Sequence, residues 1–333
     1  MNLQTQVKIP KSEFDVSHQS KIVLMGSCFS ENIGAKLKAS KFQLIVNPFG
    51  ILYNPISIYN ALDRLLTNKS FTEKDFTHYN NRYHSLMHHG SFSKFDLSEA
   101  VENVNSEFNV ASEQLKGSDV LLITFGTSYV FRWNESEEVV GNCHKIPADK
   151  FTRERLSIED VFSAWKALIN KIIGQNPSIK VIFTVSPIRH FKDGAHENQL
   201  SKAILHLSID KLMHEFPENT FYFPAYEILL DQLRDYRFYT DDMLHPSNLA
   251  QNFIWNKFSE TYFSDKTQMI IAEWHKISQA LSHKVYDSNS KEYAEFLNRT
   301  INNLQTFEEK YPYLSCLQEK QHLTQLLKNI QKE

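Results

Sequence analysis

The sequence has little cysteine, glycine and proline, and it has no long apolar run. Its 333 residues include 3 cysteines, 9 glycines and 10 prolines. So few glycines and prolines exclude fibrous and collagen-like chains. Three scattered cysteines without a C-x-x-C pair exclude a disulfide framework and a zinc knuckle. The longest apolar run, around Val120–Ile123, is far shorter than the ~20 residues of a membrane span, so no membrane span is expected.

An excess of charge of one sign is also missing. The net charge is −3, and Lys and Arg are interspersed with Asp and Glu along the chain. Because nucleic-acid binding needs a basic stripe or patch, no nucleic-acid partner is expected. The first twenty residues are polar and lack the apolar core of a signal peptide, which predicts a cytoplasmic location. With 41% hydrophobic residues, the chain can bury a sizeable globular core.

The first 265 residues alternate strand-like and helix-like segments. The expected strands are Lys21–Met25, Gln43–Val46, Asp119–Thr124, Lys180–Val185 and Thr220–Phe223, and the expected helices are 31–41, 55–66, 97–115, 157–173 and 197–215. Apolar strands separated by helices predict a parallel sheet covered on both faces, with its functional crevice at the carboxyl ends of the strands. Residues 76–95, rich in His, Asn and Ser without a clean period, predict an ordered loop.

After His245 the pattern becomes helical. Residues 247–263, 268–283, 291–309 and 315–330 carry few β-branched runs and predict four helices. We therefore expect an α/β domain over residues 1–265 and a helical C-terminal extension over 266–333, packed on the α/β body or on a partner. Heptads are not sustained, so the sequence leaves the oligomeric state open.

The segment KIVLMGSCFSE at 21–31 leads from a strand through Gly26 and Ser27 into a helix. Backbone N–H groups at a helix start favour negative charge, so a serine here can act as a nucleophile beside a site for an oxyanion. It can equally be a plain helix cap. Cys28 is an alternative nucleophile, since a thiol pKa tends to fall at a helix start. Its other interpretation is a small buried apolar side chain.

Asp242 and His245 stand three residues apart, directly before Pro246 and Ser247. A carboxylate at this spacing can hold an imidazole by Nδ1 while Nε2 faces a serine. Most D-x-x-H tetrapeptides are ordinary surface loop. Combined with the strand–Gly-Ser–helix segment at the start of the same α/β region, this one indicates a Ser-His-Asp arrangement.

The segment GSCFS at 26–30 resembles the signature of the GSCFA family, whose fifth position is usually alanine where this chain has Ser30. The resemblance extends over about residues 20–265 and includes NPFGILYNP at 47–55, TFGTSYVFRW at 124–133, SPIRHFKDGAHENQLSKA at 186–203 and RDYRFYTDDMLHPS at 234–247. The GSCFA family is a branch of the SGNH (GDSL-like) hydrolases. The resemblance implies a flavodoxin-like three-layer α/β sandwich with a catalytic serine early and D-x-x-H late.

By its position in these motifs, Ser27 matches the nucleophile, His245 the general base and Asp242 its orienting carboxylate. The neighbouring Asp241 has the wrong spacing for this role.

The resemblance identifies only some of the oxyanion donors. Gly50 in NPFG matches the glycine that donates an N–H group. Gly126-Thr127-Ser128-Tyr129 stands where the family pattern has Gly-x-Asn-Asp, so the carboxamide donor is missing. Asn142, Asn47 or the hydroxyl of Ser128 could replace it, and the sequence does not choose among them.

Further residues are expected at the substrate cleft: His88, His89, Ser128, Lys145, Arg189 and His190. Arg189 and His190 follow a strand end and could bind an anionic group or pair with Asp193 or Glu197. HExxH is absent and the histidines near residue 88 match no closed ligand set, so no metal is expected. Gly-rich phosphate loops are absent too, and no cofactor is expected.

The predicted function is a serine-dependent acyl-ester hydrolase acting on a small-molecule or carbohydrate ester. One alternative is an acyltransferase that uses the same acyl-enzyme, favoured if residues 76–95 exclude water. The other is a binding module whose catalysis has decayed, suggested by the missing asparagine, since loss of one oxyanion donor costs ~10²–10³ in rate. The retention of serine, aspartate and histidine together favours the hydrolase. The acyl group and its carrier are not encoded in any motif.

Overall fold

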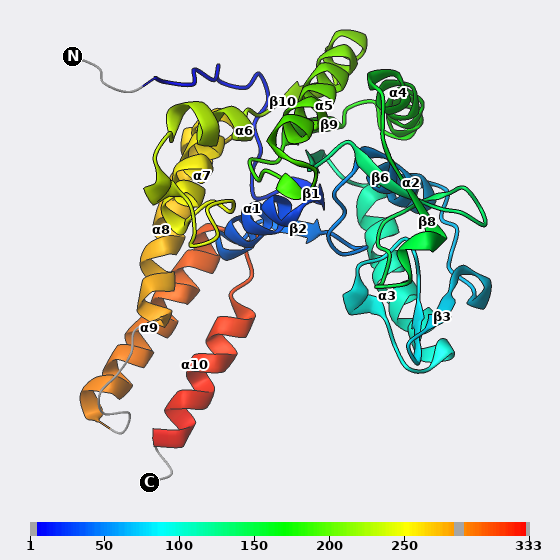
Figure 1. The fold of residues 1–333 in the computed structure, drawn as a ribbon. Helices are drawn as coiled ribbons and strands as arrows, with labels where there is room; N and C mark the ends of the chain where they lie inside the picture. Colours follow the sequence, from blue (N-terminus) through cyan, green and yellow to red (C-terminus); the bar gives the residue numbers. More distant parts are fainter. Residues whose placement is uncertain (1–4, 283–289, 331–333) are drawn as a thin grey trace.

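The computed structural model describes residues 5–282 and 290–330. A five-stranded sheet in the order β10-β9-β5-β1-β2 forms its centre (Figure 1). The strands are β1 (Lys21–Gly26), β2 (Gln43–Val46), β5 (Val120–Phe125), β9 (Lys180–Val185) and β10 (Thr220–Tyr222). All neighbours in this sheet pair in parallel. The predicted parallel α/β sheet is confirmed, and each strand ends within one residue of its expected bounds.

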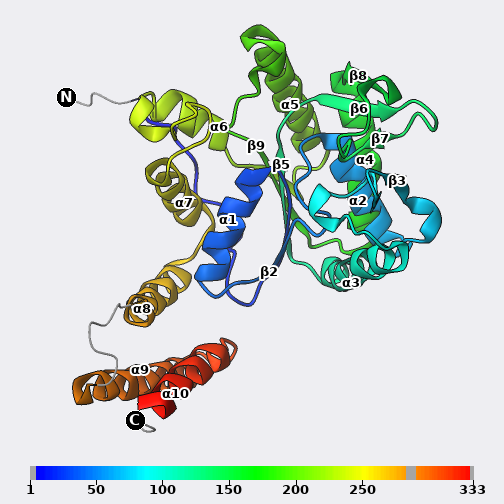
Figure 2. The same ribbon diagram turned by 60° about the horizontal axis from the view of Figure 1, so that its bottom comes forward.

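Helices cover both faces of the sheet, because alternate strand residues point to opposite sides. Val23 and Met25 pack with α2, α3, α4 and α5, whereas Ile22 and Leu24 pack with α1 and α7. Figure 2 shows the sheet between these two helical layers. The helices are α1 (Cys28–Ala39), α2 (Pro55–Leu66), α3 (Leu97–Lys116), α4 (Ile158–Gln175), α5 (Ala195–Glu215) and α7 (Asn248–Tyr262). This arrangement is the predicted three-layer sandwich.

The residues predicted as a loop at 76–95 contain a small hairpin. It consists of β3 (Thr77–Tyr79) and β4 (Arg82–His84), which pair antiparallel. Asn80 and Asn81 between them have φ of 47° and 57°, a left-handed backbone that asparagine tolerates in tight hairpin turns. The loop prediction is therefore wrong for these strands.

A second antiparallel sheet follows β5 and has no counterpart in the prediction. It is formed by β6 (Tyr129–Trp133), β7 (Val139–Val140) and β8 (Phe151–Arg155), in the order β7-β6-β8. β7 has only two residues, too few to show a period of two in the sequence.

The C-terminal helices are α8 (Asp265–Leu281), α9 (Lys291–Lys310) and α10 (Leu317–Ile330). They have a core of their own, which includes Trp274, Leu304 and Phe307, and they extend away from the sheet (Figures 1 and 2). Lys41 joins them to the α/β body by bonding the carbonyl of Ser315 at 2.9 Å and the carboxylate of Glu319 at 2.7 Å. The predicted helix end at His283 lies outside the described residues, and the domain boundary at 265/266 stays a prediction.

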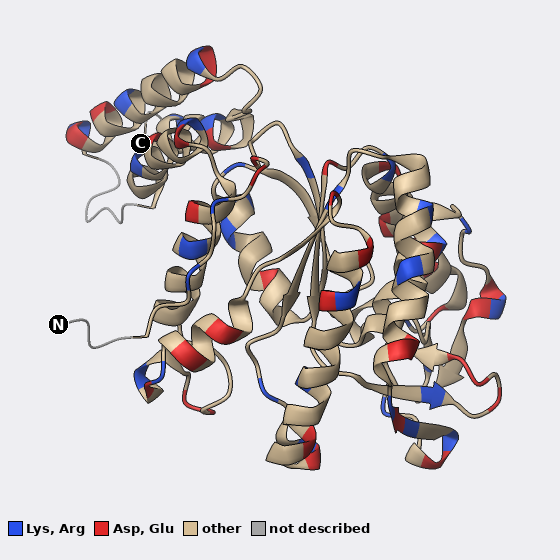
Figure 3. Ribbon diagram, turned by 90° about the horizontal axis from the view of Figure 1, so that it is seen from above, with Lys and Arg blue, Asp and Glu red and all other residues tan. Residues whose placement is uncertain are grey.

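Lys and Arg lie among Asp and Glu on the helices (Figure 3), as the mixed charge of the sequence suggests. Within the described ranges, no helix combines the length and the apolarity needed to cross a membrane.

Candidate active site

Ser27 lies between β1 and α1, at the carboxyl edge of the sheet. The preceding Gly26 has φ of 143°, and a Cβ atom at this position would come within 2.3 Å of the carbonyl oxygen of Thr124 on β5. Glycine therefore allows β1 and β5 to approach here. Asn47 Oδ1 accepts the N–H of Gly26 at 2.9 Å, and the hydroxyl of Ser30 donates to that of Thr124 at 2.7 Å. These contacts hold the turn that carries Ser27.

Ser27 also caps α1, which begins three residues earlier than predicted because of this cap. Its Oγ accepts the N–H of Phe29 at 3.3 Å, and its carbonyl accepts that of Ser30 at 2.8 Å. The first N–H groups of a helix have no partner inside the helix, which leaves those of Ser27 and Cys28 as donors for a ligand. The helix dipole favours negative charge at the same place.

Asp242 and His245 lie in the turn before α7. His245 Nδ1 lies 2.5 Å from Asp242 Oδ2. Asp242 Oδ1 accepts the N–H groups of His245 and Leu244, both at 2.9 Å, and the hydroxyl of Thr240 at 2.8 Å. These bonds, with the N–H of His245 as the largest contribution, hold the pKa of Asp242 well below its usual range. A carboxylate on Nδ1 leaves Nε2 of His245 as a proton acceptor.

Ser27 and His245 line one cavity of about 260 Å³. Ser27 is buried, with 1% of its surface exposed, whereas half of the His245 side chain is exposed. Arg189 and His190, from the loop after β9, line the same cavity, and so does Cys28. The fold thus brings together four of the predicted site residues from three separate loops: Ser27, Arg189, His190 and His245. Asp242 does not line the cavity itself but contacts His245. This cavity lies where the strand order reverses between β1 and β5, the usual ligand crevice of such sheets.

Burial raises the pKa of the Cys28 thiol, and the nearby Glu31 carboxylate adds to the effect. The expected lowering of this pKa at the helix start is therefore wrong. A thiol that stays protonated is a poor nucleophile.

Two of the predicted oxyanion donors are committed to other contacts. The N–H of Gly50 donates to the carbonyl of Asn47 at 2.7 Å, and a Cβ atom at Gly50 would come within 2.2 Å of His89 Cβ. Gly50 is thus a tight-turn residue outside the Ser27 cavity. Ser128 is fully buried, with its N–H and hydroxyl bound to Ser201 at 2.8 and 3.1 Å. The donor roles predicted for Gly50 and Ser128 do not agree with these contacts.

The other two candidates lie elsewhere. Asn142 lines a larger neighbouring pocket, and its Oδ1 accepts the N–H of His144 at 2.8 Å. Asn47 is next to Gly26 through the bond described above. Within the described part of the chain its Nδ2 is buried without a hydrogen-bond partner.

Four residues expected at the cleft lie outside it. His88 is 1% exposed, its ring stacks on that of Phe49 with 4.5 Å between centroids, and burial lowers its pKa to about 3. His88 is therefore a neutral core residue. His89 caps a short 3₁₀ turn, and neither His89, Lys145 nor Ser128 lines the Ser27 cavity or the neighbouring pocket. These positions differ from the ones expected from the sequence. Among the described residues, no three His, Cys, Asp or Glu side chains are grouped to hold a metal ion.

Lys202 on α5 is a residue beside the site that the sequence did not single out. It is fully buried, and its Nζ donates to the carbonyls of Gly126 at 2.7 Å and Ser186 at 2.8 Å, at the carboxyl ends of β5 and β9. Burial lowers its pKa to about 7, and the nearby Cys28 opposes this effect. Ser186 also lines the Ser27 cavity. The signal in the sequence was a lysine at the helical spacing of the buried face, three residues before Leu205.

His190 and Arg189 differ in their surroundings. Burial, with smaller contributions from Lys202 and His245, lowers the pKa of His190 to about 4, so its ring is neutral. The carboxylates that could have paired with Arg189 have other partners. Asp193 pairs with Arg153, and Glu197 pairs with Arg155.

The sequence profile of the GSCFA family matches residues 21–258, and that of the C-terminal domain of GSCFA domain proteins matches residues 274–329. The first range contains Ser27, Asp242 and His245. No curated protein matches the sequence.

Solved structures resemble the chain only distantly. A carbohydrate esterase of family 3 from Talaromyces cellulolyticus is 10% identical, with 77% of this chain and 99% of that one covered and a TM-score of 0.35. An acetyl xylan esterase from Butyrivibrio proteoclasticus is 12% identical, with 72% and 62% covered and a TM-score of 0.36. Likenesses this distant transfer no activity to the chain.

Proposed function

The chain belongs to the GSCFA family, and we propose that it is a serine-dependent acyl-ester hydrolase with Ser27 as its nucleophile. The observation that carries the proposal is the shared cavity of Ser27 and His245, two residues from opposite ends of the α/β region. Asp242 holds His245 by Nδ1, which presents Nε2 as a base. The substrate is an acyl ester of a small molecule or a carbohydrate.

Acylation follows from the positions of these groups. His245 Nε2 takes the proton of the Ser27 hydroxyl while Oγ forms a bond to the ester carbonyl carbon. The carbonyl oxygen becomes an oxyanion, for which the N–H groups of Ser27 and Cys28 at the start of α1 are donors. The carbon–oxygen bond to the alcohol then breaks, and the leaving oxygen takes the proton from His245. Asp242 stabilises the imidazolium during this step.

Deacylation repeats the sequence with water. His245 takes a proton from water, whose oxygen attacks the acyl carbon. The bond to Ser27 Oγ breaks, and Oγ recovers the proton, so that the products are a carboxylic acid and the free enzyme. The half-exposed His245 side chain is open to water, and residues 76–95 do not line its cavity. Both features favour hydrolysis over acyl transfer.

Lys202 also favours the negative charge of the oxyanion. Its amine donates to the carbonyls of Gly126 and Ser186, and it lies near the Cys28 thiol. A positive charge on this side of α1 stabilises an oxyanion at the N–H groups of the helix. Lys202 is a positioning residue in this scheme, since its amine contacts two backbone carbonyls and none of the reacting atoms.

Labelling with a fluorophosphonate probe tests the proposal, with the intact mass of the protein as the readout. The wild type and Cys28→Ala should gain one probe, and Ser27→Ala should gain none. Because Ser27 also caps α1, Ser157→Ala, which removes the equivalent cap of α4, is the matched control and should label fully. An unlabelled wild type, or a labelled Ser27→Ala, would contradict the proposal and favour a binding module.

A further inference from the structure

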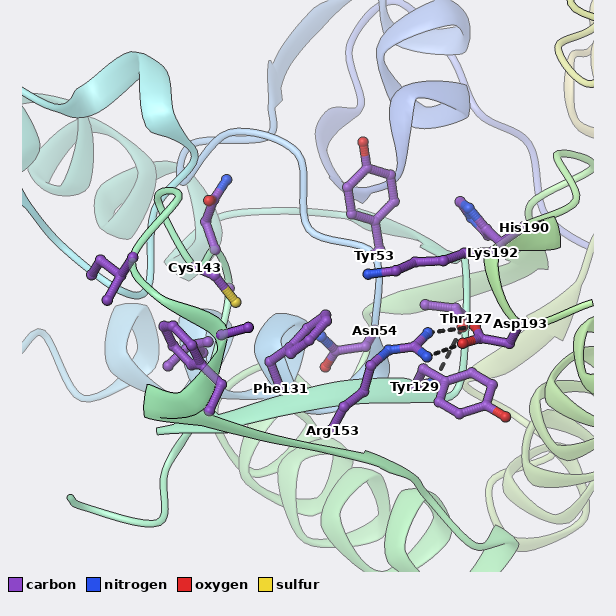
Figure 4. A pocket seen from close by; sticks show the side chains of 16 residues that line it. Tyr53, Asn54, Thr127, Tyr129, Phe131, Cys143, Arg153, His190, Lys192 and Asp193 are labelled. Atoms are coloured by element: carbon purple, nitrogen blue, oxygen red, sulfur yellow. Dashed lines mark hydrogen bonds and ion pairs between the residues drawn. The ribbon is translucent and has the colours of Figure 1, made fainter. Parts of the chain in front are cut away.

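A second pocket, of about 570 Å³, opens beside the Ser27 cavity. Tyr53, His190 and Lys192 line both. Figure 4 shows Tyr53, His190 and Lys192 grouped at one side of this pocket, with Cys143 at the other. Its volume lies in the range of ordinary small-molecule sites. A ligand at Ser27 can therefore continue into this pocket.

The wall of the second pocket is built by the antiparallel sheet that follows β5. Tyr129 and Phe131 on β6 line the pocket, as do Phe151 and Arg153 on β8. These residues alternate along their strands, and Phe131 is paired with Arg153. The residues between them point to the other face of the sheet and do not line the pocket.

Further apolar residues line the pocket, beside the polar Asn54, Thr127 and Asn142. Val140, Cys143, Ile146 and Ala148 line it from the loop around β7. The aromatic rings of Tyr53, Tyr129, Phe131 and Phe151 add to this apolar surface. A lining of this kind recognises a bulky apolar group.

Two of the charged side chains of the pocket, Arg153 and Asp193, pair with each other. Arg153 forms a two-point ion pair with Asp193 (Figure 4). Its guanidinium also lies over the ring of Tyr129, 4.2 Å from the centroid. The Lys192 amine lies 5.6 Å from the centroid of the Phe131 ring. Arg153 and Asp193 therefore neutralise each other, whereas Lys192 contacts an aromatic ring at the wall that the two cavities share.

We propose that this second pocket holds the acyl group of the substrate, and that this group is medium-chain or aromatic rather than acetyl. The inference rests on the proposed function. The leaving oxygen must reach Nε2 of His245 to be protonated, so the alcohol lies on the His245 side. His245 and Leu244 line the Ser27 cavity but not the second pocket. The acyl tail extends from the carbonyl carbon away from the alcohol, toward Tyr53 and the second pocket.

The first test compares acetyl, octanoyl and cinnamoyl esters of one alcohol with the wild-type protein. The kcat/KM of the two larger esters should exceed that of the acetyl ester by about tenfold or more, since apolar pockets discriminate on this scale. A preference for the acetyl ester would overturn the inference.

Filling the pocket gives the sharper test. Ala148 is exposed at the pocket lining, so Ala148→Trp adds an indole there without disturbing the core. The octanoyl ester should lose about tenfold in kcat/KM, and the acetyl ester should change less than about twofold. Ala272→Trp, at an exposed alanine of α8, is the matched control and should change neither. An equal loss for both esters, or a loss that follows the size of the alcohol, would overturn the assignment.

A binding measurement separates this inference from the proposed function. Octanoate, the product of the larger ester, should bind to Ser27→Ala in a calorimetric titration, and adding Ala148→Trp should raise its Kd by about tenfold. No binding to Ser27→Ala, or equal binding to the double variant, overturns the pocket assignment even if the probe labels Ser27. Binding that Ala148→Trp weakens supports it even if no ester is hydrolysed.

Discussion

The two halves of the candidate site are supported in different ways. Ser27 is buried, and its turn is held by residues on other strands and loops, through the contacts of Gly26 with Asn47 and Thr124. His245 is half exposed, and within residues 5–282 and 290–330 its partner Asp242 takes all its hydrogen bonds from Thr240, Leu244 and His245 itself. One half is built by packing across the sheet and the other by a single turn.

This difference implies different costs for substitutions. A change beneath Ser27 leaves buried groups without partners, so it lowers stability as well as activity. A change in the turn of Asp242 exposes nothing new to solvent and lowers activity alone.

Asp242→Asn should have the largest effect on activity. The amide cannot stabilise the imidazolium of His245 and can favour the wrong tautomer, so kcat/KM should fall by about 10²–10⁴. The melting temperature should hardly change, because the side chain is half exposed. Ester hydrolysis and thermal unfolding measure the two effects. Asp241→Asn is the control, and an equal loss there would contradict the assignment of Asp242.

Lys202→Met should differ from Asp242→Asn, because it should lower stability as well as activity. The carbonyls of Gly126 and Ser186 would lose their buried donor, which costs about 1–3 kcal/mol of stability. Chemical denaturation measures this loss, and Lys211→Met, at an exposed lysine of the same helix, should cost far less. Similar stabilities of the two variants would show that Lys202 is dispensable to the fold.

The lowered pKa of Lys202 predicts that the stability of the protein depends on pH. Its pKa falls from 10.5 in the unfolded chain to about 7 in the folded protein because of burial. Between these values the unfolded state binds more protons, so stability from this group rises with pH and is lost as pH falls toward 7. The free energy of unfolding of the wild type relative to Lys202→Met should therefore increase from pH 7 to pH 9. A flat difference would contradict the lowered pKa.

Thr240→Val should have a smaller effect on the His245 half. It removes one of the hydrogen bonds to Asp242 Oδ1 and leaves the two N–H donors. The loss in kcat/KM should be about two- to tenfold, the value of one hydrogen bond. Thr240→Ser keeps the hydroxyl and should retain the wild-type rate. Equal rates for Val and Thr would mean that the N–H groups alone hold the carboxylate.

His88→Phe should have the smallest effect, because His88 is a neutral core residue against Phe49. We expect kcat and KM to stay at wild-type values, with a modest loss of stability from the broken bond to Ser85. An increase in KM without a change in stability would contradict this and would support the expectation that His88 contacts the substrate.

The sequence predicted well what depends on neighbouring residues. The five strands and their helices follow from apolar periodicity, and the Asp242–His245 contact follows from a spacing of three within one turn. The sheet of β6, β7 and β8 escaped prediction because β7 has only two residues and β8 pairs with β6 across a long connection. His88, Ser128 and Lys145 looked polar enough for a cleft, but burial and local bonds place them elsewhere.

The sequence by itself therefore determined the order of strands and helices, the Gly26–Ser27 turn at a helix start, and the turn that joins Asp242 to His245. Only the tertiary structure decided which side chains share a cavity: Arg189 and His190 lie at Ser27, and Lys202 lies beneath it. The physical reason is that periodicity and spacing record contacts within a turn or a strand. Contacts between loops that follow different parallel strands depend on how the helices pack between them, and no local pattern encodes that packing.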